Sequence, residues 1–322
     1  MIGRRIYYVH FLHEKYGTVV RISPYQVAIS DPDGFVAIHR IESGFLKSPW
    51  YEEFVGDSGV GVGVFATADP VKHAVMRKLF SRAFSATSLR QNCEVVVREK
   101  VAKAVQKIKG QALHGSVDLL HWLMLMTWDV VGQLCFGESF ELLESGKPDL
   151  QARLEAEVAA VDEIHLFNDA FLEKLPLLNA VIDETLHLYS SIPSNLPRVV
   201  PPNGGKLGGH DIPGGLEVET QAYTLHRDGN VFPNPLEFDE SRWIGPAVLT
   251  PCQKSSFCPF GAGARICIGQ HLARMELRMG AAVLFNKCPG LKLSSSTTDA
   301  MMEMGNFFVV APIGHRCDVN LQ

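Results

Sequence analysis

The sequence predicts a mainly α-helical fold with small β-sheets, and two kinds of pattern support this. Apolar residues recur three or four positions apart over residues 88–109, 150–161 and 175–189, as on one face of an amphipathic helix. The β-type runs are short, and those on either side of Pro24, Val19–Ser23 and Gln26–Ile29, indicate a hairpin.

Composition limits the classes of protein to which the chain can belong. With 322 residues, of which 46% are hydrophobic, it can bury a large core as one big domain or two. Its formal net charge of -5 gives no basic surface for nucleic acid, so we expect no nucleic-acid partner. Seven cysteines without a Cys-x-x-Cys pair indicate free thiols in a reducing compartment, not a disulfide framework or structural zinc.

Proline and glycine mark the starts and ends of helices in the N-terminal part. Residues 4–16 have a helical pattern, which Gly17 ends. Asp31-Pro32 and Asp69-Pro70 each place an N-cap acceptor before a proline, which is a preferred start of a helix. The amphipathic pattern of residues 88–109 predicts one further helix.

The most apolar stretch, residues 117–136, does not predict a transmembrane helix. It is interrupted by the polar residues Asp118, His121, Asp129 and Gln133. We therefore interpret it as a buried amphipathic helix.

A glycine-rich stretch around one cysteine is the clearest chemical signal. Gly261, Gly263 and Gly269 surround Cys267, and these glycines permit a tight backbone path. An apolar helical pattern follows, so Cys267 lies just before a helix N-terminus, where the partial positive charge favours a thiolate. Such a thiolate is a soft ligand of the kind that haem iron uses, although a buried, inert cysteine is the ordinary alternative.

The residues of this stretch resemble the haem-ligand loop of the cytochromes P450. Phe260, Gly263, Arg265, Cys267 and Gly269 fit the pattern Phe-x-x-Gly-x-Arg-x-Cys-x-Gly. The resemblance implies a haem cofactor with Cys267 as its axial metal ligand, and cofactor contacts from Phe260, Arg265 and Gly269.

The resemblance also implies partners for the two haem propionates. His73 and Arg77 lie one turn apart on a predicted helix that offers donors to a propionate in the family, although a solvated polar pair is the alternative. Arg198, in an extended segment, matches a second propionate-binding arginine of the family.

A structural cluster of the family is altered in this sequence. Its Glu-x-x-Arg pattern corresponds to Glu184 and His187, and Arg242 matches the arginine that completes the cluster. Histidine has at most two donors and is only partly charged near neutrality, so Glu184 is expected to lack its nearer partner. The alternative is an exposed helical pair.

The resemblance covers two blocks, residues 4–140 and 149–312, and implies a cytochrome P450-like fold that is internally truncated. The short connection of residues 145–148 leaves no room for the central helices. The family's Ala/Gly-Gly-x-Asp/Glu-Thr motif for oxygen activation has no match, so no catalytic residue is identified. We expect one domain, 1–322, with an N-terminal portion (1–140) and a C-terminal haem-binding portion (149–322).

The resemblance implies an oxidoreductase, a haem-thiolate monooxygenase that inserts one oxygen atom from O2 into an apolar small molecule. The chain is similar to fungal members that oxidise secondary metabolites. An NADPH-dependent reductase would supply electrons, docking near Lys78, Arg82, Arg274 and Arg278. The alternative function is a truncated, catalytically inactive haem-binding remnant.

Location and substrate contacts are further expectations. The family associates with the endoplasmic reticulum membrane, but this chain has neither anchor nor transmembrane segment, which predicts a cytoplasmic or peripheral protein. Residues 44–67, with Lys47 and Tyr51 near their start, are either a surface loop or part of a substrate-facing loop. In relatives, the turn near a terminal β-run, here residues 306–310, can reach the substrate cavity.

Overall fold

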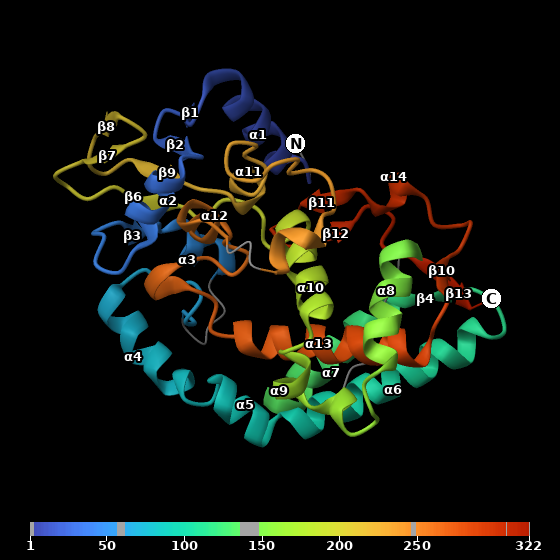
Figure 1. The fold of residues 1–322 in the computed structure, drawn as a ribbon. Helices are drawn as coiled ribbons and strands as arrows, with labels where there is room; N and C mark the ends of the chain where they lie inside the picture. Colours follow the sequence, from blue (N-terminus) through green and yellow to red (C-terminus); the bar gives the residue numbers. More distant parts are fainter. Residues whose placement is uncertain (1–2, 57–61, 136–147, 246–248, 307, 322) are drawn as a thin grey trace.

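A computed structural model describes residues 3–56, 62–135, 148–245, 249–306 and 308–321. The α-helices, labelled in Figure 1 where there is room, are α1 (Arg5–Tyr16), α2 (Pro32–His39), α3 (Trp50–Val55), α4 (Pro70–Ser81), α5 (Ala86–Asn92), α6 (Glu94–Ala112), α7 (Leu119–Cys135), α8 (Pro148–Ala159), α9 (Asp169–Leu172), α10 (Pro176–Leu188), α11 (Ala222–Leu225), α12 (Pro251–Ser256), α13 (Gln270–Lys287) and α14 (Asp299–Met302). Short 3-10 helices cover His165–Phe167, Glu240–Trp243 and Gly263–Arg265.

The helical core is built around α13, which crosses the lower half of the molecule beside α6 (Figure 1). Both helices turn apolar side chains inward, and Met275, Met279 and Val283 of α13 join Val97 and Val101 of α6 in one buried cluster. Helices α8 and α10 also pack on α13. Because α6 precedes residue 140 and the other three follow it, the core joins both portions of the chain.

Two of the sheets, the one that contains β1 and β2 and the β7-β8 pair, lie at the upper left of Figure 1, whereas the β10-β13-β4 sheet at the right adds Leu291, Val319 and Val117 to the helical core. The largest has the strand order β1-β2-β9-β6-β3, and its neighbours β2 and β9 are parallel. The strands are β1 (Val19–Ser23), β2 (Gln26–Ile29), β3 (Leu46–Lys47), β4 (Val117–Asp118), β6 (Arg198–Val199), β7 (Gly205–Leu207), β8 (His210–Ile212), β9 (Glu217–Glu219), β10 (Leu291–Leu293), β11 (Met304–Asn306), β12 (Val310–Pro312) and β13 (Asp318–Leu321). The predicted class, mainly α with small sheets, is confirmed.

Two predicted helix starts have the expected cap geometry. The Asp31 carboxylate accepts a hydrogen bond from the Gly34 amide at 2.7 Å, and α2 begins at Pro32. The Asp69 carboxylate accepts from the amides of Val71 and Lys72, and α4 begins at Pro70. Both caps satisfy amides that have no partner within the helix.

The prediction of one helix over residues 88–109 is wrong, because Cys93 separates α5 from α6. The backbone of Cys93 has φ −116°, outside the regular α-helical range, and Ser85 caps α5 by accepting from the Ser88 amide. The amphipathic pattern of residues 88–109 includes apolar residues on both faces of α6. Val95 is 52% exposed, whereas Val97 is buried.

The described residues include no helix with the length and hydrophobicity needed to cross a membrane. The predicted short connection of residues 145–148 lies outside the described part of the chain except for Pro148, the first residue of α8.

Candidate functional site

The Cys267 loop packs closely against the end of α2 at Gly263. Any other residue at this position would force the backbone of the loop or of α2 to move. Gly263 has φ +63°, and a Cβ atom there would lie 1.8 Å from the carbonyl oxygen of His39. Within the loop, the Cys267 amide donates to the carbonyl of Phe260 at 2.9 Å. Gly269 is the N-cap of α13, so the exposed Cys267 lies at the start of this long helix.

Two arginines tie the loop to α4 and to the segment before it. Arg77 of α4 donates to the carbonyl of Ile266 at 2.7 Å. Arg265 donates to the carbonyls of Thr67 and Ala68 at 2.7 and 3.0 Å. These bonds use only part of the five donors of each guanidinium. The predicted site residues Arg77, Arg265 and Cys267 are therefore brought together by tertiary contacts.

Arg198 is buried without a carboxylate partner in the described part of the chain. It is 5% exposed, and its guanidinium lies 3.4 Å from Nδ1 of His39. Arginine can only donate, so this Nδ1 is an acceptor, and Nε2 of His39 carries the proton and donates to the Thr220 hydroxyl at 2.8 Å. His39 is therefore neutral, and burial lowers the pKa of Arg198.

Two further basic side chains, His73 and Arg265, lie in the same place. Burial, followed by the charges of Arg265 and Arg77, lowers the pKa of His73 to about 4. Burial and the neighbouring Arg198 lower the pKa of Arg265 to about 10. Neither Arg77, Arg198 nor Arg265 forms an ion pair with a described carboxylate. Buried cations without anions are costly unless a ligand supplies the negative charge.

This donor set fits a haem. A thiol at a helix N-terminus suits the iron, and the cationic group beside it suits two carboxylates. Phe260, partly buried against the helical core, supplies an apolar contact. The residues that would hold the group are Cys267 for the metal and Arg77, Arg198 and Arg265 for its acidic side groups, with His73 beside them.

The family comparison decides the identity of this arrangement. The profile described as Cytochrome P450 matches residues 4–147 and 145–313. The chain belongs to the cytochrome P450 family. The match falls into two segments, as the sequence pattern predicted.

Named fungal relatives cover nearly the whole P450 chain. It is 31% identical to the cytochrome P450 monooxygenase stcB of Emericella nidulans, over 99% of this chain and 84% of the relative. It is also 31% identical to tazI, a cytochrome P450 monooxygenase of Aspergillus terreus, over 99% of this chain and 89% of the relative. The stcB alignment spans 438 positions, more than the chain's length, so that relative carries residues without a counterpart here.

The fold comparison agrees. The heme domain of cytochrome P450DA superposes with a TM-score of 0.80, at 16% identity, over 98% of this chain and 92% of that domain. The predicted P450 fold, the oxidoreductase class and the haem cofactor of the family are thus confirmed.

Glu184 has no bond to His187, the residue in the place of its nearer partner, but it pairs with Arg242 and has donors on both oxygens. Glu184 is fully buried, and its Oε1 accepts from the Asp239 amide at 2.9 Å and from Arg242 Nε at 3.3 Å. Its Oε2 accepts from the indole Nε1 of Trp243 at 2.7 Å. Trp243 thus supplies the donor that His187 does not. The sequence analysis did not identify Trp243, because the Glu-x-x-Arg pattern contains no tryptophan and the indole reaches Glu184 only in the folded protein.

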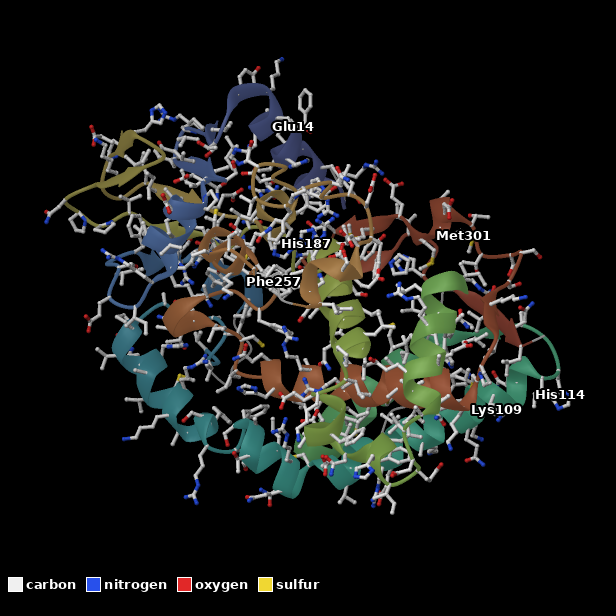
Figure 2. The ribbon with its side chains drawn as sticks, viewed as in Figure 1. Glu14, Lys109, His114, His187, Phe257 and Met301 are labelled. Carbon is white, nitrogen blue, oxygen red and sulfur yellow. The ribbon has the colours of Figure 1, made fainter. Side chains whose placement is uncertain are left out.

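His187 has an apolar role instead of a charged one. Figure 2 shows it at the upper end of α10, near Phe257. Its ring stacks on His226 with a centroid distance of 5.2 Å and packs on Phe232 at 4.6 Å. Neither ring nitrogen forms a hydrogen bond of normal geometry. Burial, more than the nearby His226 and Arg242, lowers the pKa of His187 to about 3, so it is neutral at pH 7 and not an exposed partner.

One arginine of the expected reductase patch is buried, and a second is half-buried with an acidic partner. Arg278 is 5% exposed and pairs with Asp169 at 2.6 Å, so it belongs to the core. Arg274 pairs with Asp183 at 2.8 Å. Lys78 and Arg82 are exposed, as expected.

The loop of residues 44–67 and the terminal hairpin meet in an aromatic cluster. Trp50 stacks on Phe54 at 5.0 Å, and Phe308 lies 4.8 Å from Phe54 and 5.7 Å from Phe65. Phe308 has φ +107°, a strained value for a bulky residue, and such strain is concentrated at functional sites.

Proposed function

We propose that this P450 binds haem through Cys267 and inserts one oxygen atom from O2 into an apolar small molecule, in fungal secondary-metabolite biosynthesis. The observation that carries the site assignment is the group of three arginines beside the Cys267 loop, buried Arg198 and half-buried Arg77 and Arg265, which form no ion pair with a described carboxylate. The names of the fungal relatives support the reaction class.

Each residue of the site has a distinct task. When bound, the haem supplies the activation of oxygen. The Cys267 thiolate donates electron density to the metal, and its place before α13 stabilises the negative charge. Arg77, Arg198 and Arg265 neutralise the carboxylates, and His73 lies beside them on α4.

The aromatic cluster supports a flat, apolar substrate. Trp50, Phe54, Phe65 and Phe308 come from two segments far apart in the sequence, and aromatic faces bind planar apolar groups. Phe54 and Phe65 are 48% and 42% exposed, so part of this surface is open to a ligand.

Electron supply comes from an NADPH-dependent reductase in this proposal, and its docking face includes Lys78 and Arg82. Both are exposed on or next to α4, the helix that contacts the Cys267 loop through Arg77. Docking to an acidic partner should weaken as ionic strength rises. Association with the surface of the endoplasmic reticulum is part of the same proposal.

A second function, haem binding without turnover, has its own supporting observation. Val71, Val75 and Leu79 recur at every fourth position along α4 and are 72%, 61% and 74% exposed. Such a row is the apolar face of a helix without a described neighbour. A shortage of central helices, together with the missing oxygen-activation motif, would leave this face open.

Two measurements separate these functions. The protein is loaded with haem, reduced and exposed to carbon monoxide, and the red-shifted Soret band of a thiolate ligand is expected. Cys267→Ser should abolish this band, whereas Cys252→Ser, at another exposed cysteine, should preserve it. An intact band in Cys267→Ser contradicts the assignment. A thiolate band without reductase-dependent NADPH consumption or oxygenated product favours the non-catalytic function.

A further inference from the structure

Two buried cations face each other across adjacent strands. Lys47 of β3 and Arg198 of β6 are Cα partners in the antiparallel register, and they are 7% and 5% exposed. Like charges directly opposite each other destabilise a sheet. The fold therefore holds the two cations together at a cost in stability.

No described carboxylate compensates Lys47. Its amine donates to the carbonyl of Phe65 and lies over the rings of Tyr51 and Phe65, 3.8 and 4.5 Å from their centroids. The nearest acidic residues along the sheet have other partners, since Glu219 pairs with Arg5 and Glu217 accepts from Ser48. Burial, then the charges of Arg198 and Arg265, lowers the pKa of Lys47 to about 7.

Tyr51 adds an independent observation. Its side chain, on α3, is 1% exposed, and its buried hydroxyl has no hydrogen-bond partner. The Tyr51 ring lies beneath the Lys47 amine, so its hydroxyl belongs to the same cationic environment. The positive charges of Arg198 and Arg265 favour the ionised form of this hydroxyl. A buried hydroxyl without a partner costs free energy, and a ligand oxygen would remove that cost.

We propose that Lys47 and Tyr51 bind a carboxylate of the haem together with Arg198. This inference rests on the proposed function, but it adds residues that lie outside the P450 sequence patterns described above. The amine and the hydroxyl are donors toward an anion, and one carboxylate can accept from both and from the guanidinium.

The proposal predicts opposite effects on the haem-free and the haem-loaded protein. Lys47→Met keeps an unbranched side chain and removes the buried charge, so it should raise the unfolding midpoint without haem. The same change should weaken haem binding about ten- to hundredfold, the range of a charge-assisted hydrogen bond. Tyr51→Phe should also raise the haem-free midpoint, and should weaken haem binding about three- to tenfold.

The experiment uses the full chain, produced with and without a haem supply. Affinity is measured by titrating the haem-free protein with haem and with haem dimethyl ester, in which both carboxylates are methylated. Haem loss from the loaded protein is followed by transfer to excess apomyoglobin. Both variants should lose affinity for haem, and their affinity for the dimethyl ester should equal that of the unchanged protein.

Matched variants control for altered packing. Lys206→Met removes an exposed lysine from β7, and Tyr7→Phe removes a hydroxyl that donates to the Met304 carbonyl at 3.0 Å. Neither should change haem affinity, and Tyr7→Phe should lower the haem-free midpoint.

Four outcomes overturn the proposal. Equal losses of affinity for haem and its dimethyl ester would show a packing defect, as would lower haem-free midpoints for both variants. If both variants bind haem normally while Cys267→Ser loses the thiolate band, this inference fails and the proposed function stands. If the unchanged protein binds no haem, both fail.

Discussion

The indole Nε1 of Trp243 donates to Oε2 of Glu184 at 2.7 Å, while Oε1 receives Arg242 and the Asp239 amide. Glu184 is thus a fully buried carboxylate with donors on both oxygens. In the sequence, a histidine stands where the P450 pattern has arginine, and the structure fills the vacant donor position from the segment that follows Arg242.

Trp243→Phe should lower the free energy of unfolding by about 1–3 kcal/mol, because Oε2 of Glu184 is left buried without a donor. Urea unfolding measures the change. Trp122→Phe is the matched control, since the Trp122 indole donates to Gln111 at 3.0 Å in an exposed setting. Equal losses of unfolding free energy in both variants would mean that the hydrogen bond from Trp243 to Glu184 stabilises the protein no more than an exposed one does.

His187→Arg should lower the thermal midpoint, although the expectation that Glu184 lacks its nearer partner would make an arginine there stabilising. Trp243 already supplies the donor that Glu184 would otherwise lack. The new guanidinium would enter a buried aromatic site and add charge near Arg242, at a cost on the order of 1–3 kcal/mol. His187→Phe should be neutral or stabilising. A higher midpoint for His187→Arg in thermal scans would restore the original interpretation.

Acid should destabilise the protein through two stacked histidines. Burial lowers the pKa of His226 to about 4 and that of His187 to about 3. The Nε2 of His226 accepts from the Cys258 amide at 3.0 Å, so protonation there also breaks a buried hydrogen bond.

The sign follows from the pKa difference. An unfolded histidine has a pKa of about 6.5, so the unfolded chain binds more protons below that pH. The stabilisation is present above pH 6.5 and is lost as the pH falls toward 4, by up to about 1.4 kcal/mol per pH unit for each histidine. Urea unfolding between pH 7.5 and 4.5 gives the free energy of unfolding at each pH, and its slope against pH should be smaller in His187→Phe than in the unchanged protein. The exposed His210→Gln variant is the control, and equal slopes in His187→Phe and in this control would contradict the assignment.

Gly263→Ala should displace the Cys267 loop, because its Cβ would lie 1.8 Å from the His39 carbonyl oxygen. Gly209→Ala is the control, since Gly209 also has a positive φ, +81°, but open space around it. The control should cost about 1–2 kcal/mol from backbone strain alone. Gly263→Ala should cost more and should also reduce the thiolate Soret band on haem loading. Similar losses and an intact band in Gly263→Ala would mean that the loop tolerates the shift.

Local patterns determined much of this protein. The cap residues Asp31 and Asp69 fixed the starts of α2 and α4, because a capping bond depends only on neighbours in sequence. The spacing of Phe260, Gly263, Arg265, Cys267 and Gly269 identified the family, because the residues of the haem-ligand loop lie in one continuous segment of the sequence.

Long-range placement determined the rest. Lys47 and Arg198 are 151 residues apart in number, and only the pairing of β3 with β6 makes them neighbours. Trp243 reaches Glu184, and Arg278 turns inward to Asp169, through contacts between elements that no local period encodes. Sequence periodicity indicates which face of a helix is apolar, whereas burial and charge pairing depend on which distant element covers that face.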